Sequence, residues 1–414
     1  MFDASRDIWS IVPLEYDVFI GMDVDKRSVA LTSLEHKQQI DSIKMPNKAD
    51  VVINYAKKKF PGKRIVFTYE AGPTGFGLYD KLTEAGYKCL LTNPASVPMA
   101  SNSRVKTNRV DSVKLATTLR GGELKRIRVP TCRYRQLRHI VKLYNITVKY
   151  RTASKQQIKA LLLLEGIAYP NTTRFDHWSN NTINRLEALE CNEAVRFKLD
   201  MLIADLRFHR EQLLKINRKL RLFCKNDNEL ADSMRYLTSI PGIGKTIAVH
   251  LIARIGDWRN LKNVRELGGF IGLTPCENST GDKINRGNIT RLGDKRLRNM
   301  LIEGAWTAVF RDSEMSEFYH RICSRHPKDR ASRKAVVAVA RKMTTRIYRV
   351  LKDRREYIIR DIKSKSENIE FNKKRRLNAP EDASTLRRTI KNAGDSPVTY
   401  GFVAEIETSG HLLP

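Results

Sequence analysis

Residues 17–23 read DVFIGMD, a short apolar run that ends in a carboxylate. Downstream, SVALTSL at 28–34 alternates as a half-buried strand does, and 39–45 is its predicted hairpin partner. A helix is predicted at 48–60, and RIVFTYE at 64–70 predicts a β-branched and aromatic strand that also ends in a carboxylate. The pattern therefore begins as a three-stranded meander and continues with a helix and a fourth strand.

The alternation of helices and strands continues beyond residue 70. A helix is predicted at 75–86, where it stops at a glycine, and YKCLLT at 87–92 predicts another strand. A further helix is predicted at 109–119. Three strands followed by alternating helices and strands are typical of a mixed sheet flanked by helices, so this part of the chain is predicted to be α/β.

Acidic side chains lie at the ends of two predicted strands and near the start of a predicted helix. Asp23 ends the first strand, Glu70 ends the fourth, and Asp111 falls near the start of the last helix. Strand ends and helix starts are where α/β folds place ligand-binding groups, and three converging carboxylates would hold a hard ion such as Mg²⁺. A pair of such ions can stabilise the attacking and leaving oxygens of phosphoryl transfer. The alternative is chance, because a chain with 45 acidic residues places some at strand ends and Asp often starts helices.

Charge is the strongest compositional signal. The 414 residues carry 76 Lys+Arg against 45 Asp+Glu, a net charge of +31, which indicates a polyanionic partner such as nucleic acid. With 41% hydrophobic residues the chain has enough apolar material for real cores. It has no membrane-length apolar stretch, no secretory signal pattern and no CxxC pair among its six cysteines. We therefore expect a cytoplasmic protein with no membrane partner.

The middle of the chain is predicted to be helical, at 134–165 and again at 182–223. Apolar positions in the second segment recur at alternating steps of three and four, as in a coiled coil. This seam predicts either an antiparallel hairpin against 134–165 or an interface between subunits. His209, its one polar member, is interpreted as a specificity or packing position and not as a ligand or catalytic base. The seam consists of Leu199, Leu202, Leu206, His209, Leu213, Ile216, Leu220 and Phe223.

The sequence PGIG at 241–244 predicts a turn between two helices. It is either half of a helix–hairpin–helix, whose backbone amides can meet a DNA phosphate, or a plain helical corner. Lys245 follows directly and is a candidate for nucleic-acid binding. The stretch GIGKT is not a phosphate-binding loop of the Walker type, because Ser239 stands where that motif requires glycine. ATP binding is therefore excluded.

A basic, glycine-rich segment follows at 281–301, and a helix is predicted from Arg296 to Val309. Glycine-flanked hydroxyls beside a basic cluster suit a site that handles phosphate, since arginines stabilise developing phosphorane charge. The ordinary alternatives are turn-forming hydroxyls and a solvated basic helix face. The candidate nucleic-acid ligands here are Arg286, Arg291, Lys295, Arg296 and Arg298.

Three segments of the first region resemble the DEDD transposases, the recombinases of bridge-RNA-guided insertion sequences: GMDVDK at 21–26, TYEAGPTGFGLYDKLTEAGYKCLLTNP at 68–94 and RVKTNRVDSVKLATTLRGGEL at 104–124. The resemblance implies a fold like ribonuclease H and Holliday-junction resolvases. It also implies a metal site of Asp23, Glu70, Asn108 and Asp111. The family usually has Asp where this chain has Asn108, and an amide ligates Mg²⁺ without contributing charge.

A second block, GLTPCENSTG at 272–281 with GNITRLGDKRLRNML at 287–301, resembles the part of the same transposases in which a serine beside a glycine is the proposed nucleophile. Ser279 is the predicted nucleophile, with Thr280 as the alternative. The primary hydroxyl of Ser279 is the less hindered of the two. No general base is obvious nearby, so activation is expected to depend on the metal centre or the phosphate itself.

The predicted fold class is α/β plus all-α: a ribonuclease-H-like mixed sheet with flanking helices, a long helical coiled-coil middle and a small helical C-terminal domain. The resemblance implies a transposase that cuts and rejoins strands of an insertion sequence through a phosphoserine intermediate. Its implied partners are donor and target DNA, a noncoding guide RNA and further copies of the chain in a dimer or tetramer, at the nucleoid of a prokaryote. The predicted domains are 16–130 (catalytic), 131–232 (coiled coil), 233–355 (serine domain) and 356–414 (a largely disordered basic tail).

Two other functions remain open from the sequence. A structure-selective junction nuclease would use the acidic centre and water, with no serine. A non-catalytic nucleic-acid-binding remnant would account for Asn108, and it would bind DNA without breaking it.

Overall fold

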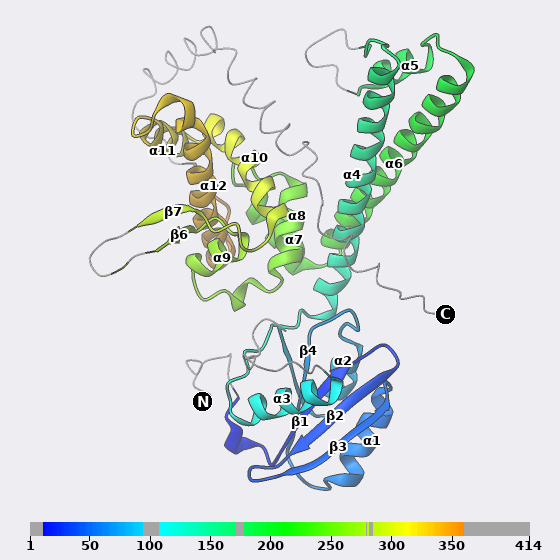
Figure 1. Ribbon diagram of the computed structural model, residues 1–414. Helices are drawn as coiled ribbons and strands as arrows, with labels where there is room; N and C mark the ends of the chain where they lie inside the picture. Colours follow the sequence, from blue (N-terminus) through cyan, green and yellow to red (C-terminus); the bar gives the residue numbers. More distant parts are fainter. Residues whose placement is uncertain (1–10, 94–106, 171–177, 279, 281–284, 360–414) are drawn as a thin grey trace. The chain divides into compact units, whose positions relative to one another are not determined.

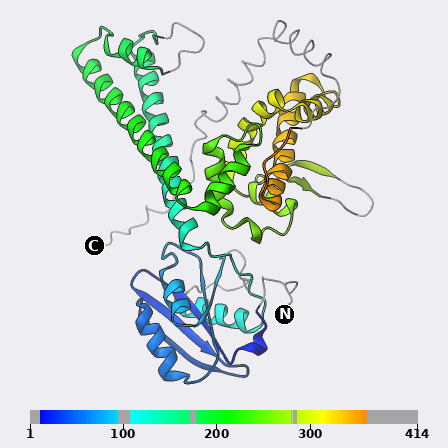
Figure 2. The same ribbon diagram turned by 180° about the vertical axis from the view of Figure 1, so that it is seen from behind.

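The computed structural model describes residues 11–93, 107–170, 178–278, 280 and 285–359. The chain forms two compact units, 1–135 and 136–414 (Figures 1 and 2). The boundary between them falls in the first turn of a long helix, α4 (Cys132–Leu164). The predicted domains 131–232 and 233–355 lie almost entirely in the second unit, and their separate bounds stay predictions.

The first unit is a five-stranded mixed sheet with helices on both faces (Figure 1). The strand order is β3-β2-β1-β4-β5, in which β1, β2 and β3 form an antiparallel meander while β4 and β5 run parallel to β1. The element order predicted from the sequence is confirmed. The elements are η1 (Pro13–Glu15), β1 (Val18–Val24), β2 (Ser28–Leu34), β3 (Gln39–Pro46), α1 (Ala49–Lys59), β4 (Ile65–Glu70), α2 (Gly77–Glu84), β5 (Lys88–Thr92) and α3 (Asn108–Arg120).

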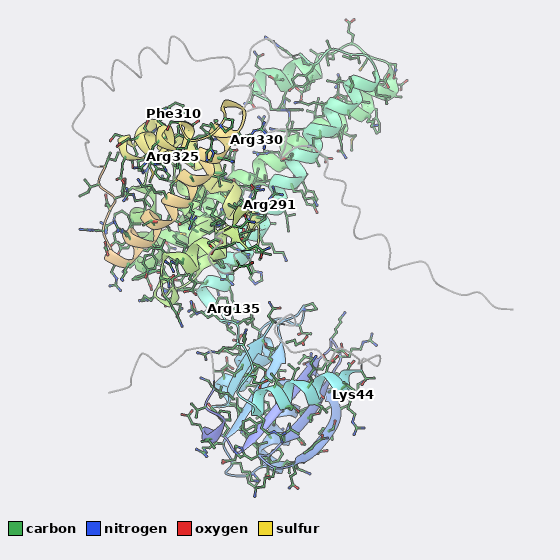
Figure 3. The ribbon with its side chains drawn as sticks, turned by 60° about the vertical axis from the view of Figure 1, so that its left-hand side comes forward. Lys44, Arg135, Arg291, Phe310, Arg325 and Arg330 are labelled. Atoms are coloured by element: carbon green, nitrogen blue, oxygen red, sulfur yellow. The ribbon has the colours of Figure 1, made fainter. Side chains whose placement is uncertain are left out.

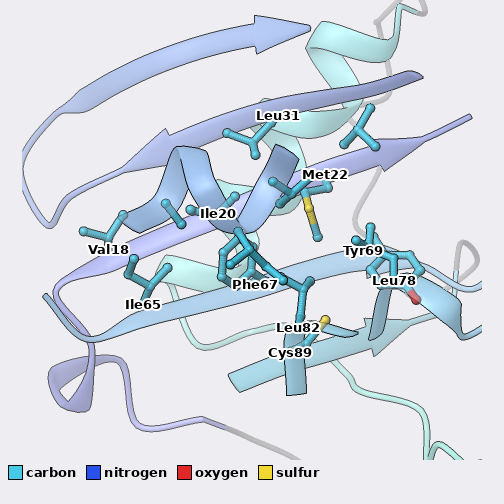
Figure 4. Close-up of a cluster of buried hydrophobic side chains, with 14 of the residues drawn as sticks. Val18, Ile20, Met22, Leu31, Ile65, Phe67, Tyr69, Leu78, Leu82 and Cys89 are labelled. Atoms are coloured by element: carbon cyan, nitrogen blue, oxygen red, sulfur yellow. The ribbon is translucent and has the colours of Figure 1, made fainter. Parts of the chain in front are cut away.

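Alternation along β1 and β4 divides the apolar side chains between two cores. Ile20 and Met22 face α1 and α2, where they join a buried cluster that includes Phe67 and Leu82 (Figure 4). Phe19 points to the opposite face, into a smaller cluster with residues of α3. Because successive side chains of a strand point to opposite faces, this division fixes the face on which every later residue of β1 lies.

A glycine lets α3 lie directly on the sheet. A Cβ atom on Gly21 of β1 would stand 2.3 Å from both the Ala116 amide nitrogen and the Ser112 carbonyl oxygen. The hydroxyl of Ser112 is 2.8 Å from that of Thr32, the residue opposite Gly21 on β2. Only a residue without a side chain permits this approach, so Gly21 fixes where α3 crosses the sheet.

The second unit is mostly helical, and none of the helices in the described ranges has both the length and the apolar composition needed to cross a membrane. After α4 it contains α5 (Asn180–Glu187), α6 (Glu193–Lys225), α7 (Asn228–Thr238), α8 (Lys245–Ile255), η3 (Trp258–Asn260), α9 (Val264–Ile271), β6 (Pro275–Glu277), β7 (Arg286–Ile289), α10 (Lys295–Arg311), α11 (Ser313–Cys323) and α12 (Lys328–Asp353).

Helices α4 and α6 lie side by side, and the seam predicted for 182–223 packs largely within the chain (Figures 1 and 2). Leu199 and Leu206 are buried in a cluster with Ile158 and Leu162 of α4, which matches the hairpin alternative. The ring of His209 stacks on a tyrosine of α4, with 5.6 Å between ring centroids. The predicted continuous segment is interrupted between α5 and α6, because the Asn192 side chain accepts the Val195 amide and starts a new helix.

The PGIG turn forms a close-packed corner between α7 and α8. Gly242 has φ +90°, and a Cβ there would stand 2.1 Å from the carbonyl oxygen of Gly304 on α10. Gly244 has open space around it and precedes the exposed Lys245. Packing thus explains the first glycine of the turn. The element before GIGKT is the helix α7, so the phosphate-loop interpretation is excluded by structure as well.

Tyr357, which falls inside the predicted tail 356–414, is bonded to the helical part of the second unit. The Tyr357 hydroxyl donates to the carboxylate of Asp312 at 2.6 Å, and its amide donates to the Ser239 hydroxyl at 2.7 Å. These bonds tie Tyr357 to α11 and α7, whose caps Asp312 and Ser239 form. Residues 360–414 lie outside the described residues.

His250 on α8 makes the stability of the second unit depend on pH. The ring is only 1% exposed, with Nδ1 2.8 Å from the Thr246 carbonyl oxygen and Nε2 3.0 Å from the Asn145 side-chain oxygen. Burial, reinforced by the charge of Arg296, lowers the pKa of His250 below its usual 6.5. The unfolded chain therefore binds more protons than the folded one at mildly acidic pH, and stability falls as pH drops below about 6.5.

We expect the free energy of unfolding to decline between about pH 7 and pH 5, and His250→Gln to flatten that decline. Urea unfolding at several pH values measures it. His139→Gln, at an exposed position of α4, is the matched control and should keep the wild-type slope. An unchanged slope in His250→Gln would contradict the assignment.

Candidate functional site

The parallel pairing of β1 with β4 places Asp23 and Glu70 side by side. Gly21 is paired with Thr68 and Met22 with Tyr69, so Asp23 and Glu70 come next along the two strands. Gly21 faces α3, and residues two positions further along a strand take the same face. Both predicted carboxylates therefore lie at the carboxyl edge of the sheet, on the face covered by α3.

The first turn of α3 lies over the same edge. Ser112 and Ala116 cover Gly21, while Leu115 and Leu119, further along α3, pack in a cluster with Phe19, nearer the start of β1. The helix therefore runs back along β1, and its first residues, with Asn108 and Asp111, lie toward the end where β1 carries Asp23. Thr107 caps this turn by accepting the Val110 amide. The partial positive charge of a helix N-terminus favours anionic groups at this place.

Asp25 also belongs to this edge, although the sequence analysis did not single it out. The Asn108 side-chain amide donates a hydrogen bond to the Asp25 carboxylate. Asp25 follows β1 directly, two residues beyond Asp23. A fourth carboxylate therefore touches the residue at which this chain lacks the usual Asp. The repeat of acids in GMDVDK was the only available sequence signal, and it could not show the contact.

The chemistry of the donor set fits a hard divalent ion. Asp23, Glu70, Asp111 and the amide of Asn108 offer oxygen ligands on one face of one sheet edge. Behind Glu70 on the same face, the buried hydroxyl of Thr68 has no hydrogen-bond partner among the described residues. The part of the chain that the structure describes holds no group of three or more His, Cys, Asp or Glu side chains gathered closely enough to bind a metal. The fold thus brings the predicted acids to one edge without assembling a coordination sphere.

The predicted nucleophile lies in sequence between two paired strands of the second unit. Strands β6 and β7 pair antiparallel, with Pro275 opposite Ile289 and Glu277 opposite Arg286. The sequence analysis predicted a glycine-rich loop here, and the two short strands were missed because they are only three and four residues long. Ser279 lies in their connection, outside the described residues. Thr280 is described and exposed.

Arg298 has a different environment from the one predicted for a phosphate ligand. It is only 6% exposed, and its Nη1 donates to the carbonyl oxygens of Ile271 (3.2 Å) and Arg291 (3.3 Å). Burial, together with the charge of Arg291, lowers the pKa of its guanidinium. Gly272, with φ +77°, leaves the space that this guanidinium fills. Arg298 therefore holds the segment after β7 against α9, and we leave it out of the proposed DNA contacts.

The other predicted basic ligands are distributed over the second unit. Arg291, Lys295 and Arg296 are exposed around the start of α10. Figure 3 labels Arg291. Asp294 caps α10 by accepting the Leu297 amide at 3.0 Å. The side chain of Arg286 lies outside the described residues.

Lys245 is exposed in the first turn of α8 and lines a groove of about 260 Å³. The groove is formed by α6, α7 and α8, and its other lining residues include Leu214, Arg221 and Met234. Lys245 thus lies apart in sequence from the basic residues at the start of α10. Both sets are available for contact with phosphate.

Comparisons with known proteins match both regions that carry the candidate residues. Residues 20–166, with Asp23, Glu70 and Asp111, match a family model described as a transposase and named for the DEDD domain of IS110 elements. Residues 234–320, with Ser279, match the model described as "Transposase IS116/IS110/IS902 family".

Individual relatives agree with these models. A putative transposase, y4qE, of Sinorhizobium fredii is 29% identical over 299 residues, covering 70% of this chain and 72% of the relative. The transposase for insertion sequence element IS1533 of Leptospira borgpetersenii is 24% identical over 71% of this chain and 86% of its own length. The transposase for insertion sequence element IS1111A of Coxiella burnetii is 26% identical over 48% of this chain and 54% of its own length.

The five-stranded mixed sheet, with acids at one edge, and the matches to both units define the class: the chain is a DNA-cleaving transposase. Within that class, both matched regions correspond to models of the IS110/IS116 transposases, and the DEDD model covers most of the first unit. Transposases with this domain generally depend on a divalent metal ion.

Proposed function

We propose that this transposase cuts and rejoins the strands of an insertion sequence with two sets of residues, the acidic edge of the first unit and the serine of the β6–β7 connection. The observation that carries the proposal is the register of β1 and β4. It puts Asp23 beside Glu70 on the face where the first turn of α3 brings Asn108 and Asp111. Neutral packing does not require four polar oxygen ligands at one sheet edge, whereas phosphoryl transfer uses them.

The acidic edge is proposed to bind Mg²⁺ through Asp23, Glu70, Asp111 and the side-chain oxygen of Asn108. When bound, the ion neutralises charge that develops on phosphodiester oxygens. The carboxylates orient the ion, and the N-terminus of α3 adds a favourable field for the phosphate itself. The side-chain nitrogen of Asn108 donates a hydrogen bond to Asp25, which leaves the side-chain oxygen of Asn108 to bind the ion.

Ser279 is proposed as the nucleophile. Its hydroxyl oxygen forms a bond to the phosphorus of a phosphodiester, and the bond from phosphorus to one bridging oxygen of the DNA strand breaks. The serine proton is released, and the departing strand end takes up a proton to become a free hydroxyl. The phosphoserine ester preserves the bond energy needed to join a second strand end. Arg291, Lys295 and Arg296 are exposed near the start of α10 and are proposed to contact phosphates.

Donor and target DNA are the proposed substrates, and a noncoding guide RNA from the element is proposed from the resemblance. The net charge of +31 supports polyanionic partners in general. A homo-oligomer, dimer or tetramer, is supported by a second apolar stripe on α6 that is exposed among the described residues. Phe197 and Met201 are 69% and 56% exposed, and Phe208 lies two turns further on the same side at 54%.

The test is a search for a covalent protein–DNA adduct. Full-length protein is incubated with Mg²⁺, element-end DNA and RNA transcribed from the flank of the element, and the products are separated under denaturing conditions. The proposal expects an adduct that EDTA prevents. Metal-dependent cleavage without an adduct would overturn the proposal in favour of a junction nuclease that uses water. Binding without cleavage, also after Asn108→Asp, would replace it with a binding protein.

Asn108→Asp tests the metal site without relying on activity. The new carboxylate would lie against Asp25, and the lost amide donor would leave two like charges in contact. We expect the metal-free melting temperature to fall by a few degrees, on the order of 1 kcal/mol. Mg²⁺ should then raise it more than in the wild type, because the added charge strengthens binding.

Thermal unfolding in EDTA and in millimolar Mg²⁺ measures both effects. Asn54→Asp, an identical charge change on the exposed side of α1, is the matched control and should leave the response to Mg²⁺ unchanged. Equal responses in the two variants would remove residue 108 from the metal site.

A further inference from the structure

Helix α12 has an unusual charge composition. From Arg330 to Lys352 it contains no acidic residue and eight basic ones: Arg330, Arg333, Lys334, Arg341, Lys342, Arg346, Arg349 and Lys352. This helix lies beyond residues 234–320, which match the transposase model. None of its basic residues belongs to the set predicted from the sequence to bind nucleic acid.

The fold sorts these cations into two groups. Lys342 and Arg346 turn toward α11, where both bond to the carboxylate of Glu314, Lys342 at 2.8 Å. Burial alone would raise the pKa of Glu314, but the hydrogen bond from Lys342 and the charge of Arg346 outweigh it and lower the pKa. One carboxylate thus pairs with both inward-facing cations, and the other six lie on the exposed side of the helix.

The exposed cations follow the helix axis. Arg330, Lys334, Arg341 and Lys352 are separated by 4, 7 and 11 residues, close to whole numbers of helical turns, so they form one stripe. Arg333 and Arg349 flank it on either side. At about 1.5 Å per residue the stripe extends over about 33 Å. We refer to these six residues as the α12 stripe (Figure 3 labels Arg330).

Four of the six cations of the α12 stripe are not neutralised by protein carboxylates among the described residues. Arg333, Lys334, Arg341 and Arg349 are exposed, and among the described residues none of the four has an acidic partner. The opposite side of α12 packs into the interior, where Ala335, Val339 and Met343 are buried. The helix is therefore held rigidly from behind and presents a straight row of positive charge in front.

We propose that the α12 stripe binds the phosphate backbone of a DNA duplex. The inference rests on DNA being the substrate of this transposase, and it adds a surface that the candidate site does not include. The length of the stripe is close to one turn of B-form DNA, about 34 Å. A duplex presents one negative charge about every 1.7 Å along its axis, so a rigid row of cations meets phosphates along its whole length. Backbone contacts of this kind position the protein and carry no sequence information.

The test removes four charges from the stripe and measures affinity for duplex DNA without metal. The variant combines Arg333→Gln, Lys334→Gln, Arg341→Gln and Arg349→Gln in the full chain. Glutamine keeps a good helix former at each exposed position, and the melting temperature checks the fold. The matched control removes four charges from exposed positions of α6 in the same unit, by Lys198→Gln, Arg218→Gln, Lys219→Gln and Lys225→Gln.

Fluorescence anisotropy with a duplex of about 30 base pairs gives the dissociation constant over a salt series. At about 0.1 M salt the stripe variant should bind about tenfold more weakly or worse, with a salt slope shallower by about 2 to 4 units. The control should change affinity less than about threefold. If the stripe variant melts early, Lys334→Gln and Arg341→Gln are measured singly, each with a proportionate loss.

Two results would overturn the proposal: equal losses in both fourfold variants, or wild-type duplex binding by the stripe variant. Absence of duplex binding by the wild-type protein would instead count against the proposed function itself. The two failures are therefore distinguishable in one experiment.

Discussion

Replacing Ser279 with alanine is expected to abolish the covalent protein–DNA adduct and to lower strand joining by about 10³-fold or more, the scale on which loss of a covalent nucleophile is felt. The reason is chemical: without the hydroxyl, no ester can store the energy of the broken phosphodiester bond. Denaturing electrophoresis of the reaction with labelled element-end DNA measures the adduct.

Two variants make this result specific. Thr280→Ala changes the neighbouring hydroxyl and should keep the adduct. Glu70→Gln leaves Ser279 intact but removes a carboxylate from the acidic edge, and it should lose the adduct as well. An adduct that persists in Ser279→Ala but disappears in Thr280→Ala would identify Thr280 as the nucleophile. Cleavage that survives both hydroxyl variants would favour attack by water.

Gly21→Ala is expected to have the largest effect on stability. The added methyl would overlap backbone atoms of α3 at 2.3 Å, and backbone cannot rotate away as a side chain can. We expect a loss of about 3 kcal/mol or more, or displacement of α3 from the sheet. Because α3 carries Asn108 and Asp111, displacement would also separate them from Asp23 and Glu70. Urea unfolding of the protein and the Mg²⁺-dependent change in melting temperature measure the two effects.

Gly77→Ala is the matched control. Gly77 starts α2 in the same unit, and a Cβ atom there would meet nothing within 4 Å. Alanine favours a helix over glycine, so this variant should be neutral or slightly more stable. A Gly21→Ala protein with wild-type stability and an unchanged response to Mg²⁺ would show that α3 can shift without cost.

The sheet of the first unit could be predicted closely from the sequence, because strand signals are local. Segments such as DVFIGMD and RIVFTYE alternate or carry β-branched residues, and the turns between them are short. The acids were also predictable, since Asp23 and Glu70 stand at the ends of such strands. Their common face needed the register between β1 and β4, which a single sequence does not contain.

The features that were missed depend on distant contacts. Asp25 meets Asn108, which is 83 positions away, and no local pattern marks that pair. Arg298 reads as one more exposed cation of a basic helix, yet its burial follows from the space that Gly272 leaves. The break before α6 had a signal in Asn192, but the apolar repeat continues on both sides and obscured it.

The contact between Gly242 and Gly304 restricts how copies of this chain can diverge. Each glycine faces the backbone of the other, so neither position has room for a side chain. A compensating substitution is also impossible, because a larger residue at one position would need a residue smaller than glycine at the other, and none exists. Copies of an insertion sequence accumulate substitutions once they are no longer selected. A side chain at either position would therefore identify a copy whose second unit can no longer pack, even where every candidate catalytic residue is intact.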